Sequence, residues 1–421
     1  MALGWLQASV MLLVFYFLSI YNLYLIDGAC RALPKGSDSS SYAGLVSGIL
    51  GKRGAYALEA SMLLYSLGLL VSYLGTVGQE LSAVVGRLAA LFMDDIEGWQ
   101  FVGPNDHDGP SMFRQDLLTA AAGVLIVLPL SLLDSSKIQL LGSLGTVCMF
   151  ITTAVVVAAV PWTTSSPFVD ACMGGGGAPA PSGQQAELVA FVPSLSGFFT
   201  QAPIFIFAMN AATAFVTIRS QLSPSGCAGA AEPVQAQSQP SPKEINSLVW
   251  IAQTVALFDY VICSASGYVT FCGGTPDNVL DAFPTTHWPS LLARSALVVQ
   301  LCCASAGVYT PLARAALWHL SQGLDAEPPS KCVTIALTLP VLLVAVVVAA
   351  ALGGALALPL SLTSAICTTG IMFVFPGLCA YYTRPPAAST LKHVVFPLAF
   401  ALLGLVIGVV STVTIVAGSV S

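Results

Sequence analysis

Ten long apolar segments follow one another along this chain of 421 residues, and they restrict its fold more than any other feature. A helix that crosses the hydrocarbon core of a bilayer needs about 20 mostly apolar residues. The segments lack strand alternation and are too long for barrel strands, so α-helices are the spanning structure that remains. They lie at residues 5–27, 56–82, 116–133, 138–161, 193–217, 246–272, 289–313, 332–353, 356–381 and 393–417. We therefore predict an all-α polytopic membrane protein with about ten transmembrane helices.

The charged residues support this prediction and orient the chain. Only 8% of the residues are charged, against roughly 25% in soluble domains. Cytoplasmic loops retain Lys and Arg, and the connections after the odd-numbered segments hold Arg31, Lys35, Lys52, Arg53, Lys137, Arg219, Lys243, Arg314, Lys331, Arg384 and Lys392. The opposite connections hold only Arg87, Arg114 and Arg294. The odd-numbered connections are thus predicted to be cytoplasmic, with both termini outside. The sequence has no basic patch of the kind that binds nucleic acid, so no nucleic-acid partner is expected.

The chain is expected to form a single transmembrane domain over residues 1–421. Two connections have a low-complexity composition that cannot build a core, one at about 162–192 and one at about 219–245. We expect both to be flexible loops.

Signals of catalysis and of metal binding are missing from the sequence. It contains no nucleophile elbow, zincin pair or phosphate loop, and no Cys-x-x-Cys pair. An enzyme, a bound metal and an organic cofactor are therefore not expected. Cys172 and Cys272 both fall on the outer side, where oxidising conditions permit a disulfide. Two free thiols are the alternative.

Polar residues inside the spans carry most of the functional signal, because the bilayer makes them costly. Asp259 lies near the middle of segment 246–272, beside Tyr260. An acid there costs roughly 2.5–3.5 kcal/mol on insertion scales, so its side chain should face protein or water. Asp259 is a candidate proton carrier or counter-charge for a substrate amine. A protonated acid that hydrogen-bonds across helices, or a misplaced helix boundary, explains it equally well.

Polar and helix-disturbing residues also gather in segment 193–217, among them Pro203, Asn210 and Thr213. Pro203 removes a backbone donor and leaves carbonyls that can line a cavity. Broken helices of this kind form midplane binding sites in secondary transporters. These three residues, with Asp259 and Tyr260, are the candidates for a substrate path. A kinked packing helix is the alternative for this segment.

A series of short motifs occurs in a fixed order along the chain. They are Ser41-Tyr42 through Leu45, Leu50 to Gly54, Leu63 to Gly78, Phe207-Ala208-Met209-Asn210, Tyr260 with Gly267-Tyr268-Val269-Thr270-Phe271, Asp277 to Pro284, and Phe375-Pro376-Gly377-Leu378 with Tyr381. In order and spacing this series resembles the amino acid/auxin permease family. The resemblance covers nearly the whole chain.

The resemblance implies both a fold and an activity. The fold is the leucine-transporter-like arrangement with an inverted five-helix repeat. The activity is secondary active transport of amino acids, driven by a proton or sodium gradient. An amino acid and the lipid bilayer are thus the expected partners, and the coupling ion takes the place of a cofactor.

Three features depart from the family pattern. Ala211-Ala212-Thr213 stands where the family has Cys-His-Pro, and Asp259 stands where an apolar residue is expected. Gly4-Trp5 resembles the start of the family's second span, so we expect the fold to lack its first helix. In sodium-coupled relatives a hydroxyl of the eighth helix helps to bind the ion, and an ungapped match anchored at Arg314 makes Ser305 the ion-binding candidate.

Two classes of function follow. The first is an amino acid transporter that works by alternating access. The second is a non-transporting membrane sensor of amino acids, a partner-binding protein or an inactive truncated transporter. The plasma membrane and a vacuolar or lysosomal membrane suit the loops equally well. The sequence specifies neither the amino acid nor the oligomeric state.

Overall fold

The chain folds into a bundle of helices. A computed structural model describes residues 4–33, 41–92, 114–133, 135–163, 194–222, 240–271, 278–283, 287–352, 357–384 and 391–420. The α-helices are α1 (Trp5–Ala32), α2 (Tyr42–Phe92), α3 (Gln115–Ala121), α4 (Leu128–Ser131), α5 (Ser135–Thr163), α7 (Leu195–Ala208), α8 (Ala212–Gln221), α9 (Pro242–Phe271), α10 (Trp288–Ala304), α11 (Thr310–Gln322), α12 (Lys331–Leu352), α13 (Ala357–Thr363), α14 (Phe375–Tyr382) and α15 (Phe396–Val420). Shorter elements are the 3-10 helix η4 (Val279–Ala282) and the π-helical segments η1 (Ala122–Val127), η5 (Ser305–Tyr309), η6 (Ser364–Thr368), η7 (Gly370–Val374) and η8 (Leu391–Val395).

Helices occupy the positions of the predicted spans. Within the described residues, nine helical stretches are long and apolar enough to cross a membrane. The shorter apolar helix Gln115–Ser131 lies where the sequence predicts the remaining span. The chain is therefore an all-helical, multi-pass integral membrane protein.

Helix α2 differs most from its prediction, because it begins at Tyr42 rather than near residue 56. Its first part carries Lys52 and Arg53 and is too polar for a hydropathy pattern to detect. Gly51 bends this part with φ 77° and ψ 177°. That left-handed conformation is open to glycine at little cost and strains other residues. A basic helical segment thus precedes the membrane-spanning part of α2.

The loop predicted at 219–245 is shorter than expected. Helix α8 continues to Gln221, and α9 already begins at Pro242. Ser241 and Glu244 form a reciprocal capping box at this start, with the Glu244 N–H donating to Ser241 Oγ at 3.2 Å and the Ser241 N–H donating to Glu244 Oε2 at 3.0 Å. Most of both predicted loops, residues 164–192 and 223–239, lies outside the described residues.

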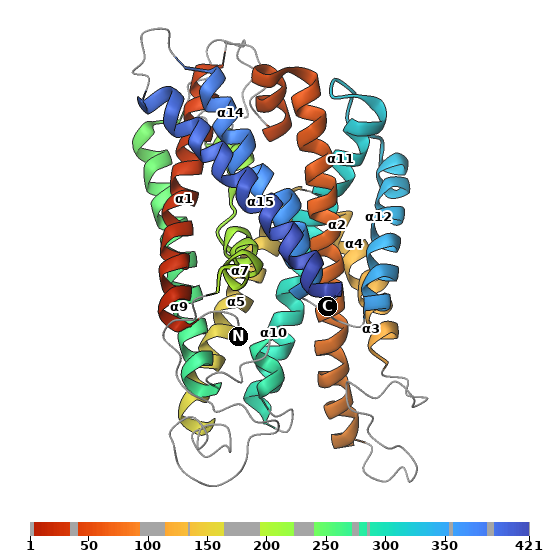
Figure 1. The fold of residues 1–421 in the computed structure, drawn as a ribbon. Helices are drawn as coiled ribbons and strands as arrows, with labels where there is room; N and C mark the ends of the chain where they lie inside the picture. The colour runs from red at the N-terminus through yellow and green to blue at the C-terminus, as the bar shows by residue number, and fades with distance from the viewer. Residues whose placement is uncertain are drawn as a thin grey trace.

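Helix α2 forms the axis of the bundle and runs through most of its height (Figure 1). On one side, buried apolar residues of α1, α7, α8, α14 and α15 pack against it. On the other side it packs against α3, α10, α11 and α12. Helix α15 crosses the bundle obliquely (Figure 1). The two apolar clusters therefore meet at α2.

The end of α1, the start of α2, the α11–α12 connection and the end of α14 lie at the same end of the bundle (Figure 1). These segments belong to or flank three of the connections predicted to be cytoplasmic from their Lys and Arg residues. The end of α2 and the start of α10 lie at the opposite end. The arrangement of the connections thus agrees with the alternation of charge in the sequence.

Candidate functional site

The fifth predicted span is interrupted near the middle of the molecule (Figure 1). Helix α7 ends at Ala208 and α8 begins at Ala212, and the backbone between them leaves helical geometry at Met209 (φ −97°, ψ 4°) and Ala211 (φ −113°, ψ 2°). A helix end leaves carbonyls without intrahelical partners, and a helix start leaves N–H groups without them. The interruption therefore offers backbone groups of both kinds inside the bundle.

Asn210 explains where the interruption falls. Its Oδ1 accepts a hydrogen bond from the Ala212 N–H at 3.1 Å and so caps α8. Asn prefers local bonds of this kind to the interior of a helix. Pro203 is buried inside α7, and the helix continues past it to Ala208. Thr213 is half-buried in the first turn of α8.

Two neighbouring helices hold the interruption in place. The carbonyl of Met209 accepts a hydrogen bond from Ser19 Oγ of α1 at 2.6 Å and one from Gln253 Nε2 of α9 at 3.5 Å. The second carboxamide atom, Gln253 Oε1, is buried and has no partner among the described residues. The sequence does not single out Ser19 or Gln253, because the Met209 carbonyl to which both donate lies far away along the chain.

Asn22 adds further unsatisfied polar atoms on α1. It follows Ser19 by three residues, which places both on one helix face. The side chain is fully buried, and neither Asn22 Oδ1 nor Nδ2 has a partner among the described residues. Buried polar groups are normally hydrogen-bonded. Unsatisfied groups on this face suit a small polar ligand or ordered water.

An aromatic cluster lies on the other side of the interruption. Asn210 Nδ2 donates to the Tyr65 hydroxyl of α2 at 3.5 Å. The Tyr65 ring centroid lies 6.5 Å from that of Phe207 and 6.0 Å from that of Tyr309, and Tyr309 lies 5.4 Å from Tyr73. Tyr260 of α9 lies near enough to Tyr309 for the two side chains to affect each other electrostatically. The structure thus brings Asn210 and Tyr260, two sequence candidates, to one group of tyrosines.

Ser305 is fully buried at the start of the π-helical segment η5. Its hydroxyl has no partner among the described residues. π-Helical turns occur frequently at functional sites, and η5 also carries Tyr309 of the aromatic cluster. The ion-binding candidate is thus part of the same helix as a residue beside the interruption.

Asp259 lies apart from this site. It is buried between α9 and α5, where the Thr153 side chain faces it. Successive residues of a helix point about 100° apart, so Asp259 and Tyr260 face different neighbours. Asp259 is 8% exposed, so protein covers most of its side chain.

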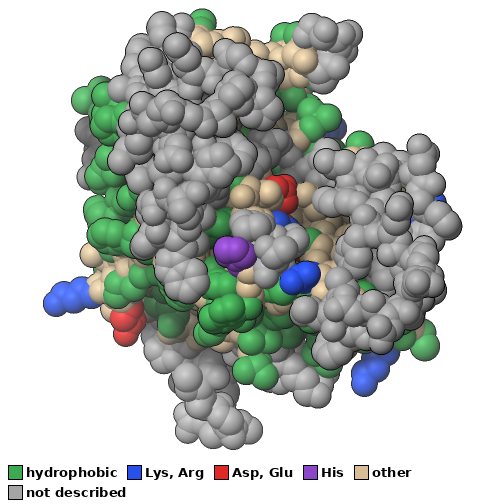
Figure 2. All heavy atoms as spheres, turned by 90° about the horizontal axis from the view of Figure 1, so that it is seen from below, with side chains coloured by type: hydrophobic (Ala, Val, Ile, Leu, Met, Phe, Trp, Pro, Cys, Tyr) green, Lys and Arg blue, Asp and Glu red, His purple; other side chains and the backbone are tan. Residues whose placement is uncertain are grey.

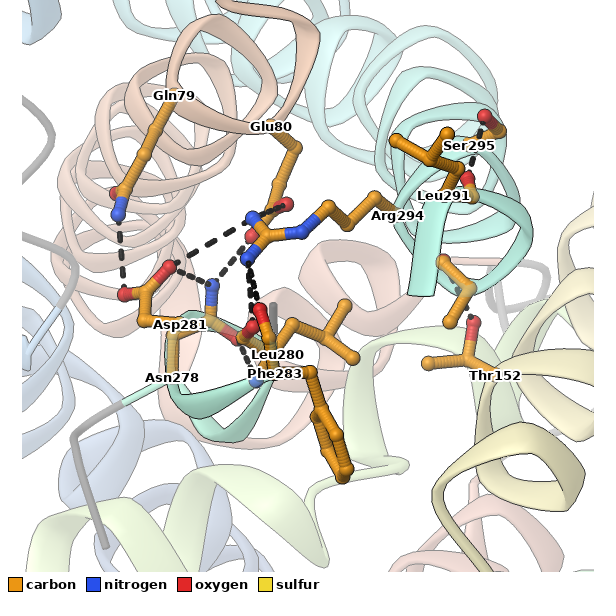
Figure 3. A network of polar contacts seen from close by, with 11 residues as sticks. Gln79, Glu80, Thr152, Asn278, Leu280, Asp281, Phe283, Leu291, Arg294 and Ser295 are labelled. Atoms are coloured by element: carbon orange, nitrogen blue, oxygen red, sulfur yellow. Dashed lines mark hydrogen bonds and ion pairs between the residues drawn. The ribbon is translucent and has the colours of Figure 1, made fainter. Parts of the chain in front are cut away.

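A second polar group joins α2, η4 and α10 at the predicted outer end of the bundle (Figure 3). Arg294 Nη1 donates to Glu80 Oε2 at 2.6 Å, and Nη2 donates to the Leu280 carbonyl at 2.6 Å. Asn278 Nδ2 donates to Glu80 Oε1 at 2.5 Å. Gln79 Nε2 donates to Asp281 at 3.0 Å. The sequence-based assignment of Arg294 to an outer loop is therefore wrong, because this arginine is a buried part of α10.

A matching group lies at the predicted cytoplasmic end. Asp27 of α1 accepts from Arg219 Nε of α8 and from Arg31 Nε, both at 2.7 Å. Arg31 Nη2 also donates to the Pro240 carbonyl at 3.3 Å. Arg219, expected in a loop, is a buried residue of the last turn of α8. The sequence did not indicate either buried ion pair, since partners about 200 residues apart leave no local pattern.

Seen from below, the end of the molecule at which α2 ends and α10 begins shows acidic, basic and histidine side chains together near its middle (Figure 2).

The predicted disulfide between Cys172 and Cys272 falls outside the described residues. Among the residues that are described, no group of three or more His, Cys, Asp or Glu could hold a metal ion.

Known proteins place the chain in a family. It is 27% identical to "Solute carrier family 38 member 10" of Homo sapiens over 271 residues, which are 64% of this chain and 20% of that relative. The protein of the same name from Pongo abelii matches equally. The chain thus matches about a fifth of the length of these curated relatives. A family described as "Transmembrane amino acid transporter protein" matches over residues 1–421. The chain therefore belongs to this family of membrane transporters, which are not enzymes.

Proposed function

We propose that this chain moves amino acids across a membrane by alternating access and binds its substrate at the interruption between α7 and α8. The interruption carries the proposal, because unwound backbone inside a bundle is tolerated only where it is buried in protein or lines a cavity. Membership of the family supports an amino acid as the substrate. We extend the proposal to a single domain with the leucine-transporter-like inverted repeat.

The groups at the interruption match the two charges of an amino acid. The first turn of α8 offers backbone N–H groups and the positive end of its dipole to a carboxylate. The end of α7 offers carbonyls to an ammonium group, and Asn210 and Tyr65 add polar side chains nearby. The rings of Phe207 and Tyr309 provide an apolar surface for the substrate side chain.

Polar contacts divide the helices into two groups, which supports alternating access. Ser19 and Gln253 bind the interrupted helix to α1 and α9, and the pair of Asp27 with Arg219 adds a second link between α1 and α8. The pair of Glu80 with Arg294 binds α2 to α10. Asn210 reaches across to Tyr65 at 3.5 Å, a long hydrogen bond. Motion of one group against the other would open the site at either end.

The coupling ion is a proton or sodium, and the membrane is the plasma membrane or a vacuolar or lysosomal one. Reconstituted proteoliposomes test the transport itself. Purified protein would be supplied with a panel of labelled amino acids under an inward pH gradient, an inward sodium gradient or neither. We expect at least one amino acid to accumulate under one gradient and not in liposomes without protein.

A matched pair of variants ties uptake to the interruption. Asn210→Ala should abolish uptake, whereas Thr217→Ala, an exposed change on α8, should retain it. If no amino acid of the panel is taken up under any gradient, the proposal of a transporter is contradicted, and a non-transporting sensor or partner-binding protein is the remaining function.

A further inference from the structure

Asp259 stands out on a helix that mostly faces outward. Phe258 and Ile262, its neighbours on α9, are 61% and 44% exposed, whereas Asp259 is 8% exposed. Helix α5 packs against α9 and covers the aspartate. The carboxyl group is therefore enclosed at the seam between α5 and α9, well inside a membrane span.

The surroundings of Asp259 contain little to stabilise a negative charge. The Thr153 side chain of α5 is the polar group that faces the carboxyl group. Cys263, one turn further along α9, faces the same seam, and Tyr260 is the adjacent titratable residue. The other oxygen, Asp259 Oδ1, is buried without a partner among the described residues. Within the described chain, no Lys, Arg or His interacts with this group.

Three other buried acids differ from Asp259 in this respect. Asp27 pairs with Arg31 and Arg219, and Glu80 pairs with Arg294. Glu59 Oε1 lies 2.6 Å from His319 Nδ1. An isolated carboxylate in an apolar environment takes up a proton rather than stay charged. Asp259 is thus a buried acid without a neighbouring cation in the described part of the chain.

We propose that Asp259 is a proton-binding site on the seam between α5 and α9, and that its protonation is coupled to occupancy of the interruption; this inference rests on the proposed function. The carboxylate takes up one proton to become a neutral acid, which allows the seam to close without water. Loss of the same proton restores the charge and requires the seam to open. The proton carries one positive charge across with the substrate.

Helix α9 provides the mechanical link. Gln253 of α9 donates a hydrogen bond to the Met209 carbonyl of the interruption at 3.5 Å, and Tyr260 lies near the aromatic cluster. Asp259 is carried by the same continuous helix on a different face. A shift of α9 that accompanies substrate binding would therefore change the seam as well.

Chemical labelling tests the site without any transport assay. Dicyclohexylcarbodiimide enters membranes and modifies protonated carboxyl groups, and peptide mass spectrometry locates the product. We expect wild-type protein to be modified at Asp259 in acidic buffer, with progressive loss of modification as the pH rises. Asp27, Glu59 and Glu80 are internal controls that should stay unmodified. An Asp259 that stays unmodified in acid, or is modified equally at every pH, would overturn the proposal.

Uptake measurements then test the coupling. Asp259→Asn should lose stimulation by an inward pH gradient while it retains exchange of internal for external amino acid. Thr153→Val should shift the pH dependence of uptake, and Cys263→Ala should leave it as in the wild type. Full pH stimulation in Asp259→Asn would contradict the coupling. If Asp259 is labelled in a pH-dependent way but the wild type takes up no amino acid, the proposed function is contradicted and the proton-binding site at Asp259 still stands.

Discussion

Burial decides how much each ion pair contributes to stability. The side chains of Glu80 and Arg294 are 0% and 4% exposed. Those of Lys52 and Asp325 are 66% and 81% exposed, although their Nζ–Oδ2 distance of 2.5 Å is equally short. Water and salt screen the second pair, so it contributes little. Removal of one partner from the first pair leaves a buried charge uncompensated.

Glu80→Ala should therefore destabilise the protein strongly. Loss of one partner of a buried pair costs about 3–5 kcal/mol, and the lower end applies because Asp281 Oδ1 stays 3.8 Å from Arg294 Nη1. Thermal unfolding of the purified protein in detergent measures the change. Asp325→Asn is the matched control and should unfold at the wild-type temperature. Equal effects of the two substitutions would show that burial does not set the contribution.

Ser305 can be tested as an ion ligand with little effect on folding, because its hydroxyl has no partner among the described residues. If Ser305 binds sodium, Ser305→Ala should raise the sodium concentration needed for half-maximal uptake, with unfolding close to that of the wild type. Ser290→Ala is the control, since Ser290 also carries a buried hydroxyl of α10 without a described partner. A wild type whose uptake is independent of sodium would end this role for Ser305.

The candidate residues show what the sequence can predict at this scale. Asn210 and Asp259 were identifiable because polar residues inside apolar segments are costly. Ser19 and Gln253 were not, since their common partner is a carbonyl on another helix. A contact between distant segments depends on how helices pack, and hydropathy carries no information about that.

At the level of elements, the approach of α15 to η6 and η7 depends on glycines. A Cβ placed on Gly408 would lie 2.6 Å from Thr369 Oγ1 and 2.8 Å from the Ala365 carbonyl. The backbone carbonyl cannot rotate away as a side chain can. Close packing of this kind is frequent where small residues line a membrane helix.

Gly408→Val should accordingly destabilise the bundle, by about 1–3 kcal/mol or more for an overpacked position. Gly142→Ala on α5 is the control, because a Cβ there meets nothing within 4 Å. The fraction of protein that elutes as a monodisperse peak in detergent, and its unfolding temperature, measure the effect. An unchanged peak for Gly408→Val would mean that α15 does not pack as described.

The elements themselves were predictable to different degrees. Apolar length located every span, since a bilayer sets that length. The polar start of α2 at Tyr42 was missed because it lies beyond the apolar run. The sequence indicated a disturbed helix from Pro203, Asn210 and Thr213 together, and it did not locate the interruption at Met209–Ala211. The π-helical segments have no sequence pattern that would predict them.

At the scale of the whole molecule, the alternation of charge predicts which end faces the cytoplasm. Cys332, an exposed free thiol at the start of α12, belongs to that end. In intact cells that display the protein, an impermeant maleimide should label Cys332 only after the membrane is permeabilised. Arg114→Cys, at the opposite end, should be labelled at once, and Cys332→Ser identifies the background. Labelling of Cys332 in intact cells would show that the chain has the opposite orientation in the membrane.

The central claim is that an amino acid binds at the interruption between α7 and α8, and ligand-dependent unfolding tests it most directly. A ligand that binds the folded state raises the unfolding temperature. At least one amino acid of the panel should stabilise the wild type and Thr217→Ala but not Asn210→Ala. Equal stabilisation of all three proteins, or stabilisation of none by any amino acid, would contradict the account.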